Sequence, residues 1–279
     1  IRTLPVSILD MIQPVDIEEY LSFLTYYEKD GQLYQNHEEG KARKLATLNT
    51  FFGYFHKKEM IEKNSPSVVD VPRVKEKNII RLDANEVAQL IDNIESGEKL
   101  TKQQKVWHDR NKLRDLAIVV TLLGTGVRVT ELVGLDISDL DVDNGAMRVI
   151  RKGGNEDIVY FGEEVEKALK RYLEVRAGIT PLAGHEHALF YSAQRKRMGV
   201  QAVENMVKKY SRQITTTKKI TPHKLRSTYG TALYQETGDI YLVADVLGHK
   251  DVNTTKKHYA ALDDARRRQA ATAVRLRED

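Results

Sequence analysis

The sequence predicts a mostly α-helical protein with a small antiparallel β-sheet, an α+β fold divided into two domains. Three observations predict it. Apolar residues recur at helical spacing through most of the chain. The stretch 139–162 instead alternates apolar and polar residues and is interrupted by glycine-containing turns. Residues 65–78 contain prolines and mixed charge without periodicity, which predicts a linker between a first domain over residues 1–64 and a longer second one.

The first domain is expected to be helical. Asp16 is placed to cap a helix over residues 17–29. A longer helix is predicted over residues 38–61, where apolar residues recur at steps of three and four and so share one face. These residues are Leu45, Leu48, Phe52 and Phe55.

The opposite face of this longer helix is basic and rich in hydroxyl groups. Such a face is usually only solvated. The same residue types also suit a helix that lies along a phosphate backbone, because they donate hydrogen bonds to phosphate oxygens. The candidate DNA-binding residues are Arg43, Thr47, Thr50, Tyr54 and Lys58.

The second domain, residues 79–260, is expected to begin with a helix capped by Asp83, with Glu86 three residues later as in a capping box. The next clear element, residues 114–123, is apolar almost all round, which predicts a buried helix. Gly124 and Gly126 are expected to end it.

The alternating stretch predicts a small antiparallel sheet with tight turns at Asn144-Gly145 and Gly153-Gly154. From residue 163 onward the pattern is helical to the end. The last part, residues 261–279, is expected to form a tail helix that docks either on its own domain or on a neighbouring subunit.

Composition narrows the functional classes. The chain has 279 residues and no cysteine, which excludes a disulfide scaffold, thiolate zinc sites and a cysteine nucleophile, and is typical of a reducing cytoplasm. No apolar run is long enough for a membrane span. The formal net charge is +4, which favours an acidic partner. The first residue is Ile1 instead of Met, which predicts a trimmed N-terminus.

Several familiar motifs fail on spacing. In a calcium loop that begins at Asp139, the glycine would arrive one place late, at Gly145, and Ile150 would replace the final glutamate. "GTGVRV" lacks the third glycine of a dinucleotide loop. His249 and His258 could be two ligands of a zinc site, but the sequence has no carboxylate or cysteine at ligand spacing from them. No cofactor and no metal are therefore expected.

One set of polar residues suits phosphoryl chemistry, although each member alone has an ordinary structural explanation. Two arginines can hold the non-bridging oxygens of one phosphate and stabilise the charge that develops when phosphorus becomes pentacoordinate. A tyrosine oxygen can attack phosphorus, and a lysine can protonate the departing oxygen. The residues are Arg128, Lys152, His223, Arg226, His249 and Tyr259.

The order of the motifs "GTGVRVTEL", "RKGG", "TPHKLR" and "LGHKDVNTT", followed by a tyrosine, resembles the tyrosine recombinase, or phage integrase, family. The resemblance covers nearly the whole chain. It implies a helical core-binding domain followed by a tyrosine recombinase catalytic domain. It also implies a site-specific exchange of DNA strands that needs neither metal nor ATP.

For this chain, the resemblance implies that Arg128 and Arg226 clamp the scissile phosphate and that His249 donates a hydrogen bond near it. Glu131 matches a supporting glutamate of the family. Lys152 would be the general acid toward the 5′ oxygen.

The resemblance also implies that His223 assists proton transfer and that Tyr259 forms the 3′-phosphotyrosine link. One departure is visible. Tyr259 lies ten residues after His249, whereas nine is common in the family, and no later tyrosine competes for the role.

Other functions remain open at this point. A type IB topoisomerase would use the same chemistry, a silent DNA-binding regulator would lack it, and a metal phosphodiesterase would need ligands that the motifs do not supply. Within the family, "TTKKHYAALDDARRR" resembles integrases of conjugative transposons, which favours a mobile-element integrase over a chromosome-dimer-resolving Xer-type recombinase.

The expected partners follow from the family resemblance. They are double-stranded DNA with a specific recombination site and further copies of the chain, as a dimer to tetramer on DNA. An accessory directionality protein would fit as an additional partner, and no membrane is expected.

Overall fold

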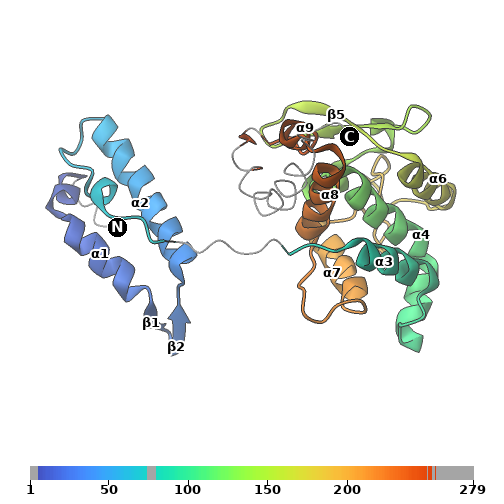
Figure 1. Cartoon of the computed structure of the whole chain (residues 1–279), viewed down its shortest axis with the longest axis horizontal. Helices are drawn as coiled ribbons and strands as arrows, with labels where there is room; N and C mark the ends of the chain where they lie inside the picture. Colours follow the sequence, from blue (N-terminus) through green and yellow to red (C-terminus); the bar gives the residue numbers. More distant parts are fainter. Residues whose placement is uncertain (1–5, 74–79, 250, 253–254, 256–279) are drawn as a thin grey trace, which may run out of the picture. The chain divides into compact units, whose positions relative to one another are not determined.

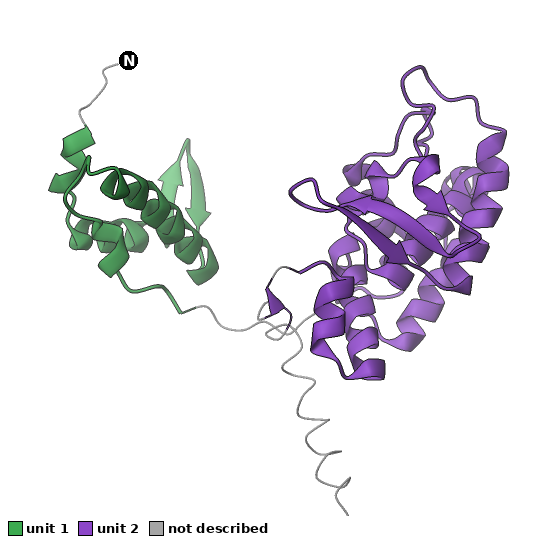
Figure 2. Ribbon diagram, turned by 90° about the horizontal axis from the view of Figure 1, so that it is seen from above, with its two compact units in different colours: residues 1–78 green, residues 79–279 purple. Residues whose placement is uncertain are grey.

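The computed structural model describes residues 6–73, 80–249, 251–252 and 255. The chain divides into two compact units, Ile1–Asn78 and Ile79–Asp279 (Figure 2). Among the described residues, no helix is both long and apolar enough to cross a membrane.

Over its described residues, 6–73, the first unit has two α-helices, two short strands and two 3₁₀ helices (Figure 1). In chain order these are η1 (Val6–Met11), α1 (Pro14–Phe23), β1 (Tyr26–Lys29), β2 (Gln32–Gln35), α2 (Glu38–Lys57) and η2 (Ser65–Val68).

The helix predicted over residues 17–29 is wrong at both ends. Gln13 is the N-cap of α1, and Asp16 lies inside the helix, where its carboxylate accepts the backbone N–H of Gln13 at 2.7 Å. After α1 the chain forms the antiparallel pair β1–β2. The turn is Asp30–Gly31, with φ of 53° and 72°. An Asp-Gly pair suits a two-residue hairpin because both turn residues need positive φ, and this signal outweighs the helical spacing.

Helix α2 confirms the longer predicted helix and its apolar face, but it ends at Lys57 instead of residue 61. Leu45 and Phe52 are buried, and Leu48 packs against the same small core. The linker prediction is wrong for its first residues. Ser65 donates to the carbonyl oxygen of Ile12 at 2.6 Å. Residues 65–69 therefore belong to the first unit instead of connecting the two.

The second unit is mostly helical with one three-stranded sheet, which confirms the predicted fold class. Its helices and strands are α3 (Ala84–Ser96), α4 (Lys102–Thr125), α5 (Val129–Gly134), η3 (Ile137–Asp139), β3 (Leu140–Asp141), β4 (Ala146–Ile150), β5 (Glu156–Tyr160), α6 (Glu163–Ala177), α7 (Val200–Ser211), α8 (Pro222–Thr237) and α9 (Ile240–Val246).

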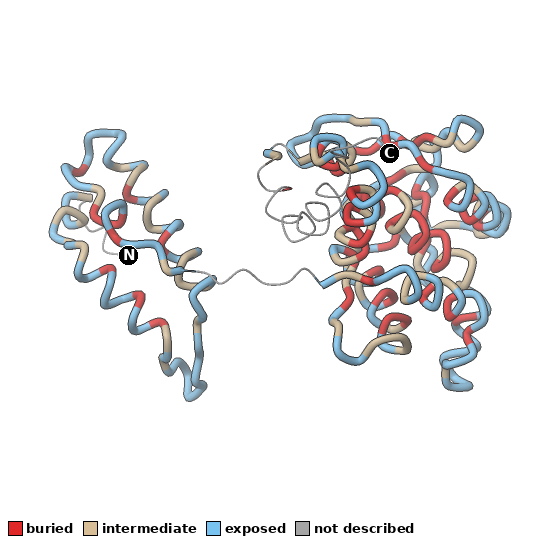
Figure 3. Tube along the Cα trace, in the orientation of Figure 1, coloured by how far each residue is buried: buried red, intermediate tan, exposed pale blue. Residues whose placement is uncertain are grey.

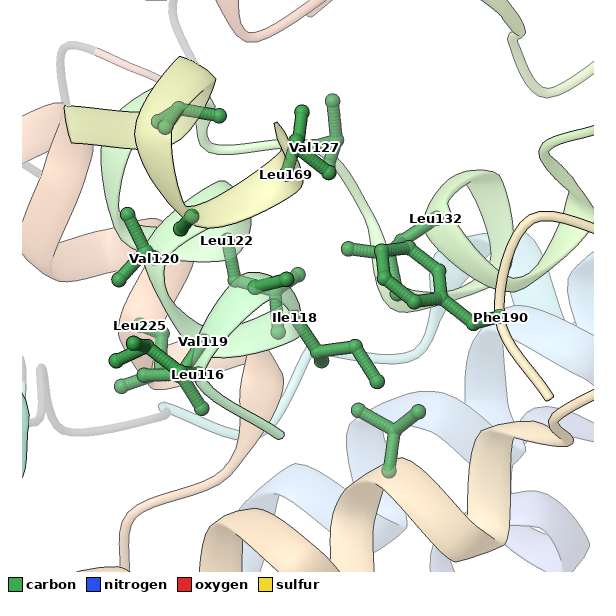
Figure 4. Packing of buried hydrophobic residues seen from close by; sticks show 14 of the residues in the cluster. Leu116, Ile118, Val119, Val120, Leu122, Val127, Leu132, Leu169, Phe190 and Leu225 are labelled. Carbon is green, nitrogen blue, oxygen red and sulfur yellow. The ribbon is translucent and has the colours of Figure 1, made fainter. Parts of the chain in front are cut away.

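Helix α4 lies at the centre of this unit and packs against α3, α6 and α8. The stretch from Leu116 to Leu122 is buried, as predicted (Figures 3 and 4). Residues 115–122, in the C-terminal half of α4, are covered on all sides, so packing fixes this end of the helix. The residues that follow α4 therefore have a well-defined position, and the candidate site begins there.

The predicted sheet is present, in the order β3–β4–β5, and both pairs are antiparallel. The prediction that the chain is helical from residue 163 onward is wrong for residues 178–199, which contain no helix. Glycine and proline interrupt this stretch. The buried side chain of Arg176 donates to the carbonyl oxygens of Glu186, Ala188 and Leu189 and thereby satisfies backbone acceptors of the loop.

Gly126 ends α4 and should be intolerant of a side chain. Its φ is 64°, and an added Cβ would lie 2.8 Å from Leu247 Cδ2 and would also collide with the Tyr229 ring. We expect Gly126→Ala to lower the free energy of unfolding by about 2–4 kcal/mol, from backbone strain and overpacking together. Urea denaturation followed by circular dichroism measures this loss.

The matched control is Gly184→Ala. Gly184 has a φ of 84° and no described neighbour within 4 Å of an added Cβ, so only the backbone cost of about 1 kcal/mol is expected. Equal losses in the two variants would show that Tyr229 and Leu247 move aside at no cost.

Candidate active site

Arg128 follows directly after the end of α4 and caps α5. Its backbone N–H donates to Glu131 Oε2 at 2.8 Å, and its Nη1 donates to Glu131 Oε1 at 2.7 Å. Nη2 lies 3.3 Å from the carbonyl oxygen of Gly248. The Glu131 side chain is only 2% exposed, whereas that of Arg128 is 32% exposed. A buried carboxylate therefore orients a guanidinium group that still reaches the surface.

Arg226 comes from α8 and is 4% exposed. Its Nη1 donates to the carbonyl oxygen of Gly126, and its Nη2 donates to that of Leu247. Arg128 and Arg226 thus bind neighbouring carbonyl oxygens in the turn after α9. Figure 1 shows α8, α9 and β5 at the same end of the second unit. The fold brings together two arginines that are far apart in the sequence.

Arg128 lines a pocket of about 710 Å³. Lys152, in the turn between β4 and β5, and His249, after α9, line it together with Arg128. His249 Nδ1 lies 2.6 Å from the hydroxyl of the buried Thr255. A pocket with guanidinium, ammonium and imidazole groups at its wall is suited to bind a phosphate.

A family model described as "Phage integrase family" matches residues 80–266, which is most of the chain. The chain belongs to the phage integrase family. It is a site-specific tyrosine recombinase, an enzyme that breaks and rejoins DNA strands. The family resemblance and the function inferred from the motif order are confirmed.

Curated relatives and solved structures agree with this assignment. The recombinase is 31% identical over 276 residues to tyrosine recombinase XerC of Caldanaerobacter subterraneus subsp. tengcongensis, covering 97% of this chain and 72% of the relative. It is 34% identical over 218 residues to XerC of Thermodesulfovibrio yellowstonii, covering 77% and 69%.

Among solved structures, XerA recombinase has a TM-score of 0.59 at 29% identity, over 99% of this chain and 87% of that one. The fold also matches the Tn1549 transposon integrase in complex with transposon right end DNA, with a TM-score of 0.72 at 22% identity, over 95% and 87%.

The remaining catalytic candidates are His223 and Tyr259. His223 is exposed near the start of α8, and the residues described around the pocket do not include it or Arg226. Tyr259, the predicted nucleophile, lies outside the described residues, as does the predicted tail helix over residues 261–279.

Arg151 is the residue of the recombinase site that sequence reasoning missed. Its Nε donates to Asp157 Oδ2 at 2.9 Å, its Nη1 to Glu131 Oε2 at 3.2 Å, and its Nη2 to the carbonyl oxygen of Val246 at 3.1 Å. The strand pattern of the sequence could have identified this residue. Met147 and Val149 are buried on one face of β4, and the two-residue period of a strand places residue 151 on that same face. An arginine there needs internal partners.

The five candidate DNA-binding residues, four on α2 and Lys58 at its C-cap, are all exposed. The Thr47 hydroxyl donates to the carbonyl oxygen of Arg43 at 2.9 Å, and the Thr50 hydroxyl donates to that of Ala46 at 2.9 Å. These hydroxyl protons would have to rotate away from the helix to reach a phosphate. Arg43 and Lys58 are therefore the stronger phosphate-binding candidates of the set.

The weak zinc possibility gains no support from the described ranges, in which no three His, Asp or Glu side chains gather as potential ligands. His258, the second histidine of the pair considered for zinc, lies outside them.

Proposed function

We propose that this recombinase is the integrase of a mobile element, with the first unit as its core-binding domain and the second as its catalytic domain. The observation that carries the catalytic assignment is the convergence of Arg128 and Arg226 on adjacent carbonyl oxygens of the turn before His249. Lys152 lines the pocket next to this turn. Three cationic side chains from different parts of the chain thus lie at or next to the turn that leads into His249.

In this mechanism Arg128 and Arg226 bind the non-bridging oxygens of the scissile phosphate. Glu131 and the backbone carbonyls hold both guanidinium groups before the substrate arrives, so little reorganisation is needed as charge develops on phosphorus. His249 binds the same phosphate through Nε2. His249 Nδ1 lies 2.6 Å from the Thr255 hydroxyl. We assign the tautomer in which this hydroxyl donates to Nδ1 and the imidazole proton is on Nε2, because only this tautomer has a donor for the phosphate.

Tyr259 supplies the nucleophile. Its phenolic oxygen bonds to phosphorus, the bond to the 5′ oxygen breaks, and Lys152 gives a proton to that leaving oxygen. His223 assists removal of the phenolic proton. The product is a 3′-phosphotyrosine and a free 5′ hydroxyl. Rejoining reverses these steps with a 5′ hydroxyl from another strand, so the energy of the original bond is conserved.

The mobile-element assignment rests on the likeness of residues 254–268 to transposon integrases. The second candidate, a chromosome-dimer-resolving Xer-type recombinase, is favoured by curated relatives named XerC. Covalently trapped DNA, recovered from cells and sequenced, distinguishes the two. An integrase should yield the ends of an element and its insertion target, whereas a resolvase should yield one chromosomal site. Recovery of a single chromosomal site would overturn the integrase proposal.

We further propose that the recombinase acts as a dimer that pairs into a tetramer on DNA, because strand exchange needs two cut duplexes side by side. Sedimentation with a duplex that carries the recovered site measures the assembly. A complex that never exceeds one chain per site would contradict this arrangement.

The α2 face is proposed to follow the DNA backbone. We expect Arg43→Ala and Lys58→Ala each to weaken binding to all duplexes alike. Each should also reduce the slope of log affinity against log salt by about one unit, as the loss of one phosphate contact predicts. Titration at several salt concentrations measures both effects.

Lys167→Ala is the control for net charge. Lys167 is 70% exposed on α6 of the second unit and pairs with Glu163, so its loss should leave affinity nearly unchanged. If all three variants weakened binding equally, the effect would be one of total charge, and α2 would have no specific role.

Cleavage is expected to persist in EDTA. The arginines supply the positive charge at phosphorus and Lys152 supplies the proton, so the proposed chemistry has no step for a divalent ion. The measurement compares trapped covalent complex with and without EDTA. A loss that added Mg²⁺ restores would show that the reaction uses a metal.

A further inference from the structure

Three arginines donate to three successive carbonyl oxygens at the C-terminal end of α9. Arg151 binds the carbonyl oxygen of Val246, Arg226 that of Leu247, and Arg128 that of Gly248. Carbonyl groups at a helix end lack partners within the helix and carry partial negative charge, so cations bind them well. The turn that leads into His249 is therefore held by side chains from the β4–β5 hairpin, α8 and the start of α5.

Arg151 differs from the other two arginines. Each of its three side-chain nitrogens donates to a protein oxygen, and the side chain is only 10% exposed. The Arg128 side chain is 32% exposed. Arg151 is accordingly built into the wall of the site, and its contacts are with the protein.

The backbone of Arg151 closes the turn that carries Lys152. Its N–H donates to the carbonyl oxygen of Asn155 at 2.7 Å, and its own carbonyl accepts from Gly154 at 3.0 Å. The β4–β5 ladder ends just before it, at the pair Ile150–Glu156. Arg151 is therefore the last anchored residue before Lys152, which is exposed in the turn.

The side chain of Arg151 ties this turn to the rest of the site. It packs on Gly248, where an added Cβ would lie 2.9 Å from Arg151 Nε and 3.0 Å from Cζ. The absence of a side chain at Gly248 is what allows this contact. Glu131 joins the two sides, because Oε1 binds Arg128 while Oε2 binds Arg151. One buried carboxylate thus links the phosphate-binding arginine to the base of the hairpin.

We propose that Arg151 is a positioning residue that sets the place of Lys152 relative to the scissile phosphate. This inference rests on the role proposed above for Lys152 as the general acid. Without Arg151, the hairpin loses its contacts with the α9 end and Glu131, and Lys152 samples positions too far from the 5′ oxygen. The rate of proton transfer to the leaving group should therefore fall. Arg128 should stay in place, because it keeps Glu131 as its partner.

A sulfur atom in place of the bridging 5′ oxygen isolates this step. A thiol has a pKa of about 8.5, so the sulfur departs as thiolate without a proton donor. The full chain is mixed with two duplexes that carry the recovered site, one with bridging 5′ oxygen and one with bridging 5′ sulfur. Covalent complex is then measured over time on a denaturing gel.

On the oxygen substrate, Arg151→Gln should slow covalent attachment by about 10- to 100-fold. This loss is no larger than the rate gain that a general acid provides, because Lys152 itself is still present. On the sulfur substrate it should react at close to the wild-type rate, as Lys152→Ala should. Arg151→Lys keeps a cation for Glu131, and a smaller defect with the same rescue is expected. This variant serves in the comparison if Arg151→Gln does not fold.

Arg148→Gln is the matched control. Arg148 lies on β4, three residues before Arg151, is 47% exposed and pairs with Asp139 and Glu156, so its loss removes two ion pairs from the hairpin. Its attachment rate should match the wild type on both substrates. A defect of Arg148→Gln as large as that of Arg151→Gln would mean that the hairpin is merely destabilised, and would overturn the proposal.

Two other outcomes are separable. If sulfur rescues Lys152→Ala but neither Arg151 variant, Arg151 does not act through Lys152, and only the present inference fails. If sulfur does not rescue Lys152→Ala, the general-acid role of Lys152 is wrong and the inference fails with it.

Discussion

Tyr259→Phe is expected to abolish covalent attachment to DNA while leaving DNA affinity at the wild-type level. Phenylalanine keeps the ring and removes the oxygen that we propose as the nucleophile, so the phosphoester should not form. Binding should persist because it depends on many phosphate contacts elsewhere on the recombinase. This is the largest effect that we predict, a complete loss.

A suicide duplex, nicked close to the scissile phosphate, provides the measurement, because the short product diffuses away and leaves the covalent complex trapped. The matched control is Tyr241→Phe. Tyr241 is 70% exposed on α9, and its variant should be trapped like the wild type. A band of wild-type intensity from Tyr259→Phe would show that another residue is the nucleophile.

Arg128→Lys is expected to slow cleavage by about 100-fold or more, the scale of losing one donor to the transition state. The guanidinium group of Arg128 binds Glu131 through Nη1 and the Gly248 carbonyl through Nη2, and it still reaches the surface. A lysine has one nitrogen on a flexible stem, so it cannot hold these partners and also present paired donors to a phosphate.

The measurement separates catalysis from binding. Single-turnover trapping should fall, whereas affinity from a gel-shift titration should change little, because the charge is retained. Arg148→Lys, an exposed arginine changed in the same way, should react like the wild type. Equal losses in affinity and in cleavage for Arg128→Lys would identify Arg128 as a docking residue only.

Local patterns predicted several elements well. The Asp83–Glu86 capping box is present, with hydrogen bonds of 2.8 and 2.9 Å, because both partners lie within four residues of each other. The buried part of α4 was also predictable, since a run that is apolar on every side has to be covered. The Asp30–Gly31 hairpin was missed, although its turn signal is equally local, because the surrounding aromatic residues were assigned to a helix.

The order of short motifs in the sequence was sufficient to determine the family, the reaction class and the candidate residues at the site. Residue identity carries this information directly, since only certain groups can bind a phosphate, attack it or protonate its leaving oxygen. The roles proposed for Arg128, Arg226 and Lys152 therefore follow from the sequence and the family that it resembles.

Only the tertiary structure decided how these residues are held. The carbonyl oxygens of residues 246–248 each bind an arginine from a different part of the chain, and Glu131 joins Arg128 to Arg151. Periodicity reports which face of a helix or strand is buried, but not which distant residue covers it. The place of Arg151 in the site depends on α9 packing beside the β4–β5 hairpin, and that contact follows from the burial of the whole core, not from any local stretch of sequence.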